Sequence, residues 1–186
     1  LGQYAHGNEP SHHIIYLYAF TDQFKTGQKY IHQVITDFHQ NTPNGMIGND
    51  DCGQMSAWYI LSSLGFYPVN PANGTFVIGS PQVKKATLHL PQNKRFVVKA
   101  QNISEANIYQ ENPTLNKAPL QQPFFRYSDI MLGGVLKFHD FSQACTGHRR
   151  RLTRKPVRTG DERLVEALPS RHPGVRCRTA CRRASR

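Results

Sequence analysis

The sequence predicts an α+β fold, with helices first, strands after them and a basic tail at the end. Apolar residues recur at helical spacing over about the first 65 residues and at alternate positions from about residue 75. The last 39 residues show neither pattern and contain no Phe, Tyr or Trp. Because helices and strands follow one another without alternating, the pattern favours α+β over a doubly wound α/β fold.

Three helices are expected in the first region, over residues 11–20, 26–39 and 52–64. The first is apolar nearly all round, which is typical of a helix buried between neighbours. The second has a single apolar face and Thr26 as a possible cap, and the third begins after Asp50 or Asp51 and ends at Gly65. Three such helices cannot bury their own apolar faces, so we expect that Leu1 is not a natural domain start.

Strands are expected over residues 75–79, 85–90, 95–100 and 133–138, where the apolar period changes from 3.6 to 2. Asn-Gly, Pro-Gln-Asn and Gly-Gly supply turn signals between them. We therefore predict helices over residues 1–68 and a β region, antiparallel in its pairing, over residues 69–141.

The charge of the chain is concentrated in its tail. Residues 1–147 carry ten Lys and Arg against nine Asp and Glu, a net +1, whereas residues 148–186 carry thirteen against three, a net +10. We expect residues 142–186 to be disordered, because they hold too few apolar side chains to form a core. An abrupt Arg-rich change of this kind is typical of a shifted reading frame, although a basic arm can also bind nucleic acid through its charge.

The cysteines and the apolar runs argue against a disulfide-rich, a zinc-binding or a membrane-spanning protein. The four cysteines do not form a disulfide or zinc pattern, and we expect Cys52 to be a small buried side chain. No apolar run is long enough for a membrane helix, so we expect no membrane partner.

Two acidic sites stand where a loop enters a helix: Glu9 in "GNEPSHH" and the pair Asp50 and Asp51 in "GNDDCGQMSAW". Acids in this position commonly cap a helix, and the local sequence alone favours that interpretation. However, polar residues and one aromatic residue accompany them, and such a set suits a sugar, whose hydroxyls need hydrogen bonds and whose ring stacks on an aromatic face. The candidate substrate-binding residues are His12, His13, Asn49, Gln54 and Trp58, although at least one of the two histidines is expected to be a packing residue.

Two carboxyls from separate loops also meet the needs of glycoside hydrolysis. One must protonate the leaving oxygen, and the other must activate water or attack carbon. The residues alone leave the choice between capping and catalysis open.

The strings "GNEPSHHIIYLYAF", "GMIGNDDCGQMSAWYILSSLGFYPVNP" and "TFVIGSPQVKKATLHL" closely resemble the C-terminal portion of the bacterial glycoside hydrolase family 92 α-mannosidases, from about Gly7 to Phe138. The resemblance implies that the chain holds the last helices of an (α/α)6 catalytic barrel and a C-terminal β region. It does not extend to residues 142–186.

The resemblance further implies calcium-dependent exo-hydrolysis of terminal α-mannosides, including N-glycan-type oligosaccharides, with inversion. It assigns the general acid to Glu9 and the base to Asp51, with Asp50 beside it, while Asn49 stands where members often carry an acid. Most calcium ligands are expected outside this chain, so no metal ligand is assigned. Full-length members are expected in the periplasm, on the outer surface or secreted.

The resemblance also implies a β-sandwich domain before the (α/α)6 barrel. Because the matching strings cover neither that domain nor the upstream barrel helices, we expect this chain alone to be inactive or nearly so. Two alternatives belong to other classes: a nucleic-acid-binding or interaction protein acting through its tail, and a non-catalytic carbohydrate-binding remnant. The body lacks an interleaved basic and aromatic pattern, which argues against the first. The sequence leaves the oligomeric state and the preferred mannoside linkage open.

Overall fold

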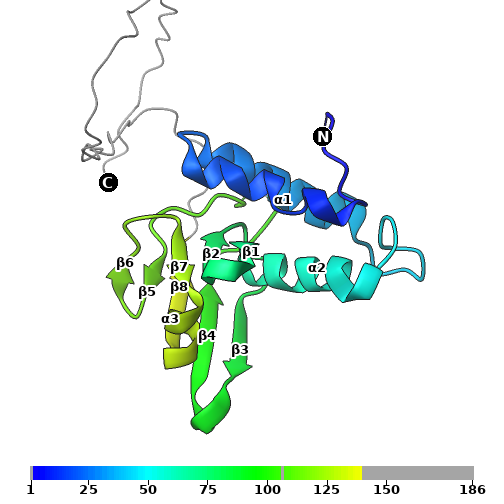
Figure 1. Cartoon of the computed structure of the whole chain (residues 1–186). Helices are drawn as coiled ribbons and strands as arrows, with labels where there is room; N and C mark the ends of the chain where they lie inside the picture. The colour runs from blue at the N-terminus through cyan, green and yellow to red at the C-terminus, as the bar shows by residue number, and fades with distance from the viewer. Residues whose placement is uncertain (1, 106, 140–186) are drawn as a thin grey trace, which may run out of the picture. The chain divides into compact units, whose positions relative to one another are not determined.

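The computed structural model describes residues 2–105 and 107–139 (Figure 1). The chain divides into compact units of residues 1–147 and 148–186, so the predicted regions 1–68 and 69–141 both fall within the first unit. The predicted basic tail, residues 142–186, lies outside the described residues. None of the helices in the described part is long and apolar enough to cross a membrane.

Helices occupy the N-terminal region, as predicted. They are the 3-10 helices η1 (Glu9–Ser11), η2 (Ile14–Phe20) and η3 (Asp51–Gly53), and the α-helices α1 (Phe24–Phe38) and α2 (Gln54–Leu64). In place of the helix expected over residues 11–20, the structure has the tighter 3-10 helix η2, and η1 ends at Ser11 before it. The single apolar face predicted for the second helix is confirmed, since Ile31, Val34 and Ile35 are buried along α1.

Two predicted helix ends have different outcomes. Thr26 does not cap α1, because the helix begins at Phe24 and the Thr26 amide already donates to the Gln23 carbonyl. Gly65 does end α2, with φ of 94° and its amide directed at the Leu61 and Ser62 carbonyls. A left-handed residue at this position closes the last turn, and glycine adopts it without a steric penalty.

Two sheets follow the helices (Figure 1). A three-stranded sheet has the order β1-β2-β7, and a five-stranded sheet has the order β3-β4-β8-β5-β6. The strands are β1 (Phe66–Asn70), β2 (Thr75–Ile78), β3 (Lys85–His89), β4 (Arg95–Ala100), β5 (Thr114–Leu115), β6 (Ala118–Pro119), β7 (Phe124–Arg126) and β8 (Gly134–Phe138). Short helices η4 (Pro71–Asn73), η5 (Pro91–Asn93) and α3 (Tyr127–Leu132) connect some of them.

The predicted antiparallel pairing needs one correction, because β4 and β8 pair in parallel, with Val98 opposite Leu136. Parallel neighbours require a connection of a dozen residues or more. Residues 101–133 provide it, since they carry β5, β6, β7 and α3 before the chain returns to β4.

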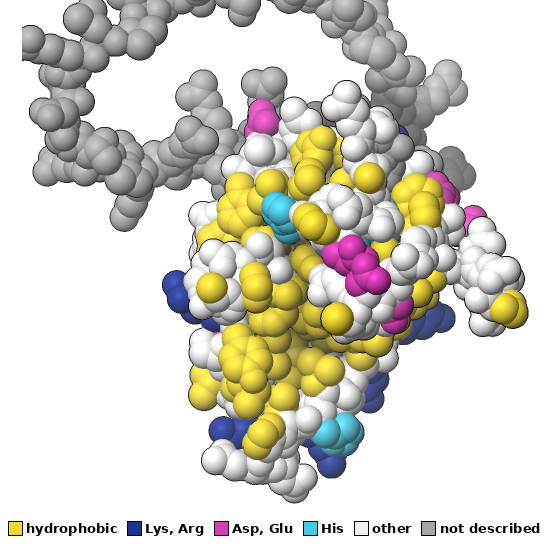
Figure 2. Space-filling model, turned by 45° about the vertical axis from the view of Figure 1, so that its right-hand side comes forward, with side chains coloured by type: hydrophobic (Ala, Val, Ile, Leu, Met, Phe, Trp, Pro, Cys, Tyr) yellow, Lys and Arg dark blue, Asp and Glu magenta, His cyan; other side chains and the backbone are white. Residues whose placement is uncertain are grey.

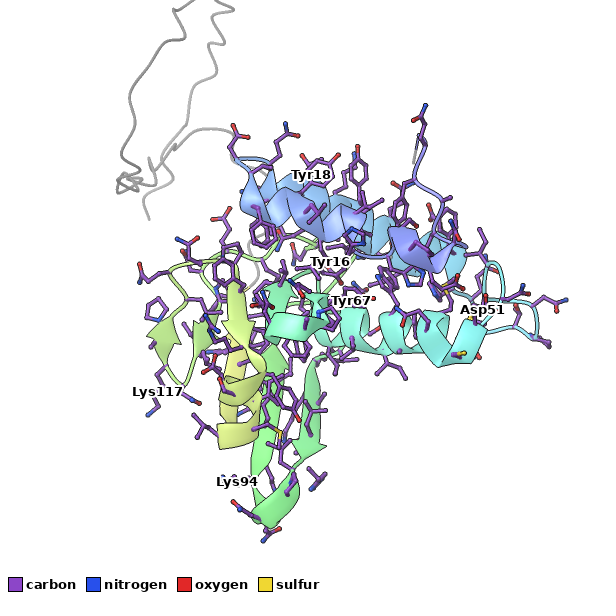
Figure 3. The ribbon with its side chains drawn as sticks, viewed as in Figure 1. Tyr16, Tyr18, Asp51, Tyr67, Lys94 and Lys117 are labelled. Carbon is purple, nitrogen blue, oxygen red and sulfur yellow. The ribbon has the colours of Figure 1, made fainter. Side chains whose placement is uncertain are left out.

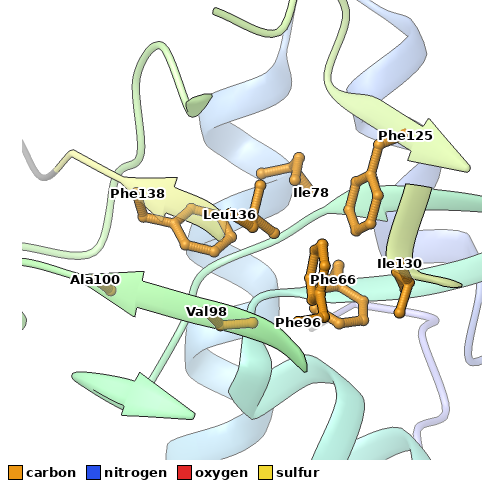
Figure 4. Close-up of a cluster of buried hydrophobic side chains, with 9 residues drawn as sticks. All are labelled: Phe66, Ile78, Phe96, Val98, Ala100, Phe125, Ile130, Leu136 and Phe138. Atoms are coloured by element: carbon orange, nitrogen blue, oxygen red, sulfur yellow. The ribbon is translucent and has the colours of Figure 1, made fainter. Parts of the chain in front are cut away.

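Two groups of buried side chains hold the elements together. The first joins both sheets to α3 and is formed by Phe66, Ile78, Phe96, Val98, Ala100, Phe125, Ile130, Leu136 and Phe138 (Figure 4). The second joins η2, α1 and α2 to the three-stranded sheet and is formed by Ile15, Tyr16, Ile31, Val34, Ile35, Trp58, Tyr67 and Val77. The second group supports the loops that carry the acidic residues.

Large apolar side chains also lie on the surface of the helices. Ile14, Leu17 and Phe20 of η2 are 44–50% exposed, and Ile60 of α2 is 59% exposed. One face of the molecule carries a broad area of hydrophobic side chains (Figure 2). The all-round apolar character of residues 11–20 therefore does not correspond to burial on every side.

Candidate active site

The first acidic loop is held by its own backbone and by Ser11. The Ser11 Oγ lies 2.6 Å from the Ala5 carbonyl oxygen and 2.8 Å from that of Asn8, and the His12 amide donates to the Glu9 carbonyl. Pro10 occupies the first turn, where its missing N–H carries no penalty. The sequence from Ala5 to His12 therefore fixes where Glu9 stands.

The Glu9 side chain is not used as a cap. The preceding residue, Asn8, makes no side-chain cap bond either. Glu9 Oε1 is buried, and it has no hydrogen-bond partner among the described residues. A buried carboxylate oxygen without a partner is costly in a folded protein, so it calls for a reason other than local stability.

The two acids of the second loop differ in their surroundings. The Asp50 carboxylate accepts hydrogen bonds from the Ser56 amide at 2.9 Å and from the Ser56 hydroxyl at 2.5 Å. These bonds, the hydroxyl first, lower the pKa of Asp50. Asp50 therefore satisfies a free amide in the first turn of α2, although the N-cap residue itself is Gly53.

Asp51 is exposed at the N-terminal end of α2 (Figure 3). No hydrogen bond to its carboxylate occurs among the residues that the structure describes. Cys52 and Gly53 follow with φ of 52° and 77°, and this left-handed turn redirects the chain into the helix. The Cys52 side chain is exposed, so the expectation of a buried cysteine was wrong.

The two acidic loops touch at a pair of glycines. A Cβ atom added to Gly48 would lie 2.9 Å from the Gly7 carbonyl oxygen and 3.0 Å from the Gly7 Cα. Gly48 also has φ of 73°, a conformation that favours glycine. The sequence analysis missed this contact, although a signal was present: both loops contain Gly and Asn directly before an acid, at Gly7 and at Gly48.

The predicted substrate-binding residues occupy different environments. His12 is 1% exposed, and its Nε2 lies 3.0 Å from the His6 carbonyl oxygen. Gln54 joins it to the sheet, with its amide 3.4 Å from His12 Nδ1 and 2.8 Å from the Tyr67 hydroxyl. His12 is therefore the expected packing histidine. His13, before η2, is partly buried, and Asn49 is exposed.

The prediction that Trp58 stacks on a sugar does not fit the structure. Trp58 is 0% exposed, because this position of α2 faces the second core and not the loop entrance. The His39 ring stacks on it with centroids 5.8 Å apart, and the His6 ring meets it edge to face at 4.3 Å. Its indole N–H donates to the His12 carbonyl at 3.2 Å, so Trp58 supports the first acidic loop from beneath.

The described residues do not assemble a metal site. No group of three or more His, Cys, Asp or Glu side chains in this part of the chain could hold a metal ion. The acids and histidines of the two loops therefore do not by themselves fit the calcium ion that the family resemblance implies.

Comparisons with known proteins identify the family of the chain. The model of the glycosyl hydrolase family 92 catalytic domain matches residues 1–139. The chain belongs to glycosyl hydrolase family 92. This confirms the family resemblance drawn from the three strings between Gly7 and Phe138.

Solved family 92 structures are similar to the chain. An α-mannosidase from Bacteroides thetaiotaomicron, also solved in complex with mannoimidazole, is 39% identical, with a TM-score of 0.72 over 76% of this chain and 19% of that one. An inverting mannosidase from the same organism is also 39% identical, with a TM-score of 0.70 and the same coverages. A protein of Arthroderma benhamiae described as an uncharacterized secreted glycosidase is 27% identical over 134 residues, which are 70% of this chain and 17% of that protein. The chain thus spans less than a fifth of the length of these relatives.

Proposed function

We propose that this chain forms part of the catalytic domain of an α-mannosidase that removes terminal α-linked mannose. The observation that carries the proposal is the backbone contact between Gly7 and Gly48, which brings two acidic loops side by side. Membership of family 92 supports the reaction class, and the mannosidases among its relatives support the substrate. N-glycan-type oligosaccharides are the proposed substrates.

We assign the general acid to Glu9 and the base to Asp51. Glu9 has a buried carboxylate oxygen without a hydrogen-bond partner among the described residues, so this oxygen is not already engaged by a neighbouring side chain or amide. Asp50 is engaged by Ser56, so Asp51 is the better candidate to activate water. Inversion requires space for that water between the two carboxyls, about 6.5–9.5 Å from one to the other.

His13, Asn49 and Gln54 are the proposed polar contacts of the sugar. The part of the site near Gln54 also contains the Tyr67 hydroxyl, which its amide contacts at 2.8 Å. Calcium is proposed for the complete domain, with its ligands mostly outside the described residues. The roles of Glu9 and Asp51 do not involve it.

The chain by itself is proposed to be inactive. Ile14, Leu17 and Phe20 expose large apolar surfaces along η2, which fit the inner contacts of an (α/α)6 barrel. The matched segment covers 19% of the Bacteroides α-mannosidase, so in a complete domain of this kind other segments would supply the remaining helices and sugar contacts. The secreted relative supports an extracytoplasmic location for the complete protein.

A chimaera tests the proposal. Residues 1–139 would replace the matching segment of the Bacteroides α-mannosidase, and turnover of an α-mannobiose with calcium would be measured. The isolated chain should show no turnover and the chimaera should show it, with β-mannose as the first product by NMR.

In the chimaera, Glu9→Gln and Asp51→Asn should each lower kcat by about 10²–10⁴-fold. Asp50→Asn is the matched control and should have a smaller effect, because its carboxylate serves the helix. Turnover within a few-fold of the parent in Glu9→Gln or Asp51→Asn would refute the assignment. Mannose binding without turnover in the unsubstituted chimaera would favour a carbohydrate-binding remnant.

A further inference from the structure

Three histidines surround the one tryptophan of the chain behind the two acidic loops. We call His6, His12, His39 and Trp58 the imidazole cluster. The His6 ring lies 4.7 Å from that of His12, 5.3 Å from that of His39 and 4.3 Å from that of Trp58, centroid to centroid. His6, His12 and Trp58 are at most 1% exposed. The sequence analysis proposed His12 and Trp58 as substrate contacts, but it did not single out His6 or His39.

The cluster connects the segments that carry the acids. His6 and His12 flank the loop of Gly7 and Glu9, whereas His39 follows α1 and opens the segment that leads to the second acidic loop. Trp58 belongs to α2, the helix that follows that loop. A change in the packing of the cluster would therefore shift both acidic loops together.

The hydrogen bonds of His12 and His39 match neutral imidazole rings. His12 donates from Nε2 to the His6 carbonyl, and its Nδ1 accepts from the Gln54 amide. His39 donates from Nδ1 to the Val34 carbonyl at 3.3 Å, and its Nε2 is buried without a hydrogen-bond partner in the described part of the chain. These tautomers follow from carbonyls being acceptors only.

At His6 the partner is a hydroxyl, which can donate or accept, so the tautomer is not fixed. The His6 Nδ1 lies 2.9 Å from the Tyr4 hydroxyl, and its Nε2 is buried without a hydrogen-bond partner among the described residues. An imidazolium donates from both nitrogens, so protonation would bury an unpaired N–H in His39 and would break the Gln54 bond to His12.

The surroundings offer little compensation for a positive charge. The titratable groups near the cluster are Tyr4, Glu9, Tyr16, Tyr59 and Tyr67, and Glu9 alone among them is a carboxyl. Burial opposes a positive charge on all three histidines, whereas the nearby Glu9 carboxylate favours a positive charge on His12. Burial, then the neighbouring histidines, lowers the pKa of His6 to about 3, and burial also lowers the pKa of His12 and of His39.

We propose that the imidazole cluster is a pH-sensitive positioning device, which holds the Glu9 loop against the Asp51 loop while its histidines are neutral and releases it when they are protonated. Its consequence for catalysis, a reversible loss of activity on the acid side, rests on the proposed function. The opening itself does not, so it can be measured on this chain without any turnover.

The size of the effect follows from proton linkage. Above the ordinary histidine pKa of 6.5 the imidazoles are neutral in the closed and open loops alike. As the pH falls below that value the open form binds protons first, so the closed form loses stability until the pH reaches the lowered pKa values. At pH 5, about 1.5 units below the ordinary value, each imidazole excluded from protonation raises the open population about 30-fold.

Hydrogen exchange on the full 186-residue chain tests the proposal. Two loop amides are informative: Ser11, which donates to the Asn8 carbonyl, and Ile47, which donates to the Phe38 carbonyl. After correction for intrinsic rates, their exchange should rise at least about 30-fold between pH 7 and pH 5, while amides of β4 and β8 stay within about twofold. Trp58 emission, from the single tryptophan, should change over the same pH range.

His6→Phe keeps a planar ring but cannot be protonated, so it should reduce the rise in loop exchange by about 30-fold. His89→Gln, an exposed histidine of β3, is the matched control and should leave it unchanged. NMR titration of the histidine rings in the unsubstituted chain gives an answer even if His6→Phe fails to fold. Three outcomes would overturn the proposal. The exchange rates of loop and sheet amides could rise equally, the loop exchange rates could be independent of pH, or the histidines could titrate at their ordinary pKa while the loops stay closed.

Discussion

Replacing Gly48 with alanine should separate the two acidic loops, and Gly53 provides a control for the backbone strain. Both glycines are left-handed, with φ of 73° and 77°. An L-residue in that conformation costs about 1–2 kcal/mol. The difference between them is the space for a side chain: a Cβ on Gly48 meets the Gly7 backbone at 2.9 Å, whereas a Cβ on Gly53 meets nothing within 4 Å.

The contact at Gly48 cannot be relieved by rotating a side chain, because the neighbouring atoms are backbone. The loops must move apart by several tenths of an ångström. We therefore expect Gly53→Ala to lower the free energy of unfolding by about 1–2 kcal/mol and Gly48→Ala to lower it by a further ~1–3 kcal/mol, the usual cost of overpacking.

Urea unfolding of the full chain, followed by Trp58 fluorescence, measures both values. Equal losses in the two variants, within about 0.5 kcal/mol, would show that the loops are not in contact and would remove the main support for a shared site. In the active chimaera, Gly48→Ala should also lower kcat, because displacement of a reacting group by about 1 Å can cost about 10²-fold.

Three further outcomes are expected. Asp50→Asn should lower the free energy of unfolding at pH 7 but not at pH values below the lowered pKa of Asp50. The bonds from Ser56 stabilise the folded chain fully above the unfolded pKa, and this stabilisation is lost as the carboxylate protonates. Urea midpoints at several pH values measure this. Tyr16→Phe should lower the free energy of unfolding by about 1–3 kcal/mol, because the buried Tyr16 hydroxyl donates to Ser62 at 2.7 Å. Tyr127→Phe, at a residue 53% exposed, is the control and should lower it by less than about 0.5 kcal/mol in the same assay. Chelation of calcium should leave the thermal midpoint of this chain unchanged, since its described residues form no metal cluster; a downward shift with EDTA would contradict that reading of the ligand set.

Elements with local patterns could be predicted from the sequence. The apolar face of α1 and the alternation of β4 give their type and position because neighbouring residues determine them. Strand β1 was missed because "FYPVN" contains a proline and an asparagine. The structure accommodates Pro68 at a register shift, where a missing N–H is tolerated.

Long-range features could not be predicted in the same way. The parallel pairing of β4 with β8 depends on where residues 101–133 carry the chain, and no local pattern records that path. The direction of Trp58 depends on His6 and His39, which approach it from other segments. For the site, the sequence identified the acids and predicted that Asp50 or Asp51 serves the start of α2, but only the bonds to Ser56 distinguish Asp50 from Asp51.

The strand order also governs when this protein can fold on the ribosome. β8 lies in the middle of its sheet but is synthesised after all the other described strands, and β5 and β6 join β3 and β4 only through it. Until Phe138 has emerged, one edge of β4 has no partner, and an unpaired edge invites pairing with other chains. The nascent chain is therefore most vulnerable to aggregation late in translation. A peptide strand that pairs with the open edge of β4 should protect it.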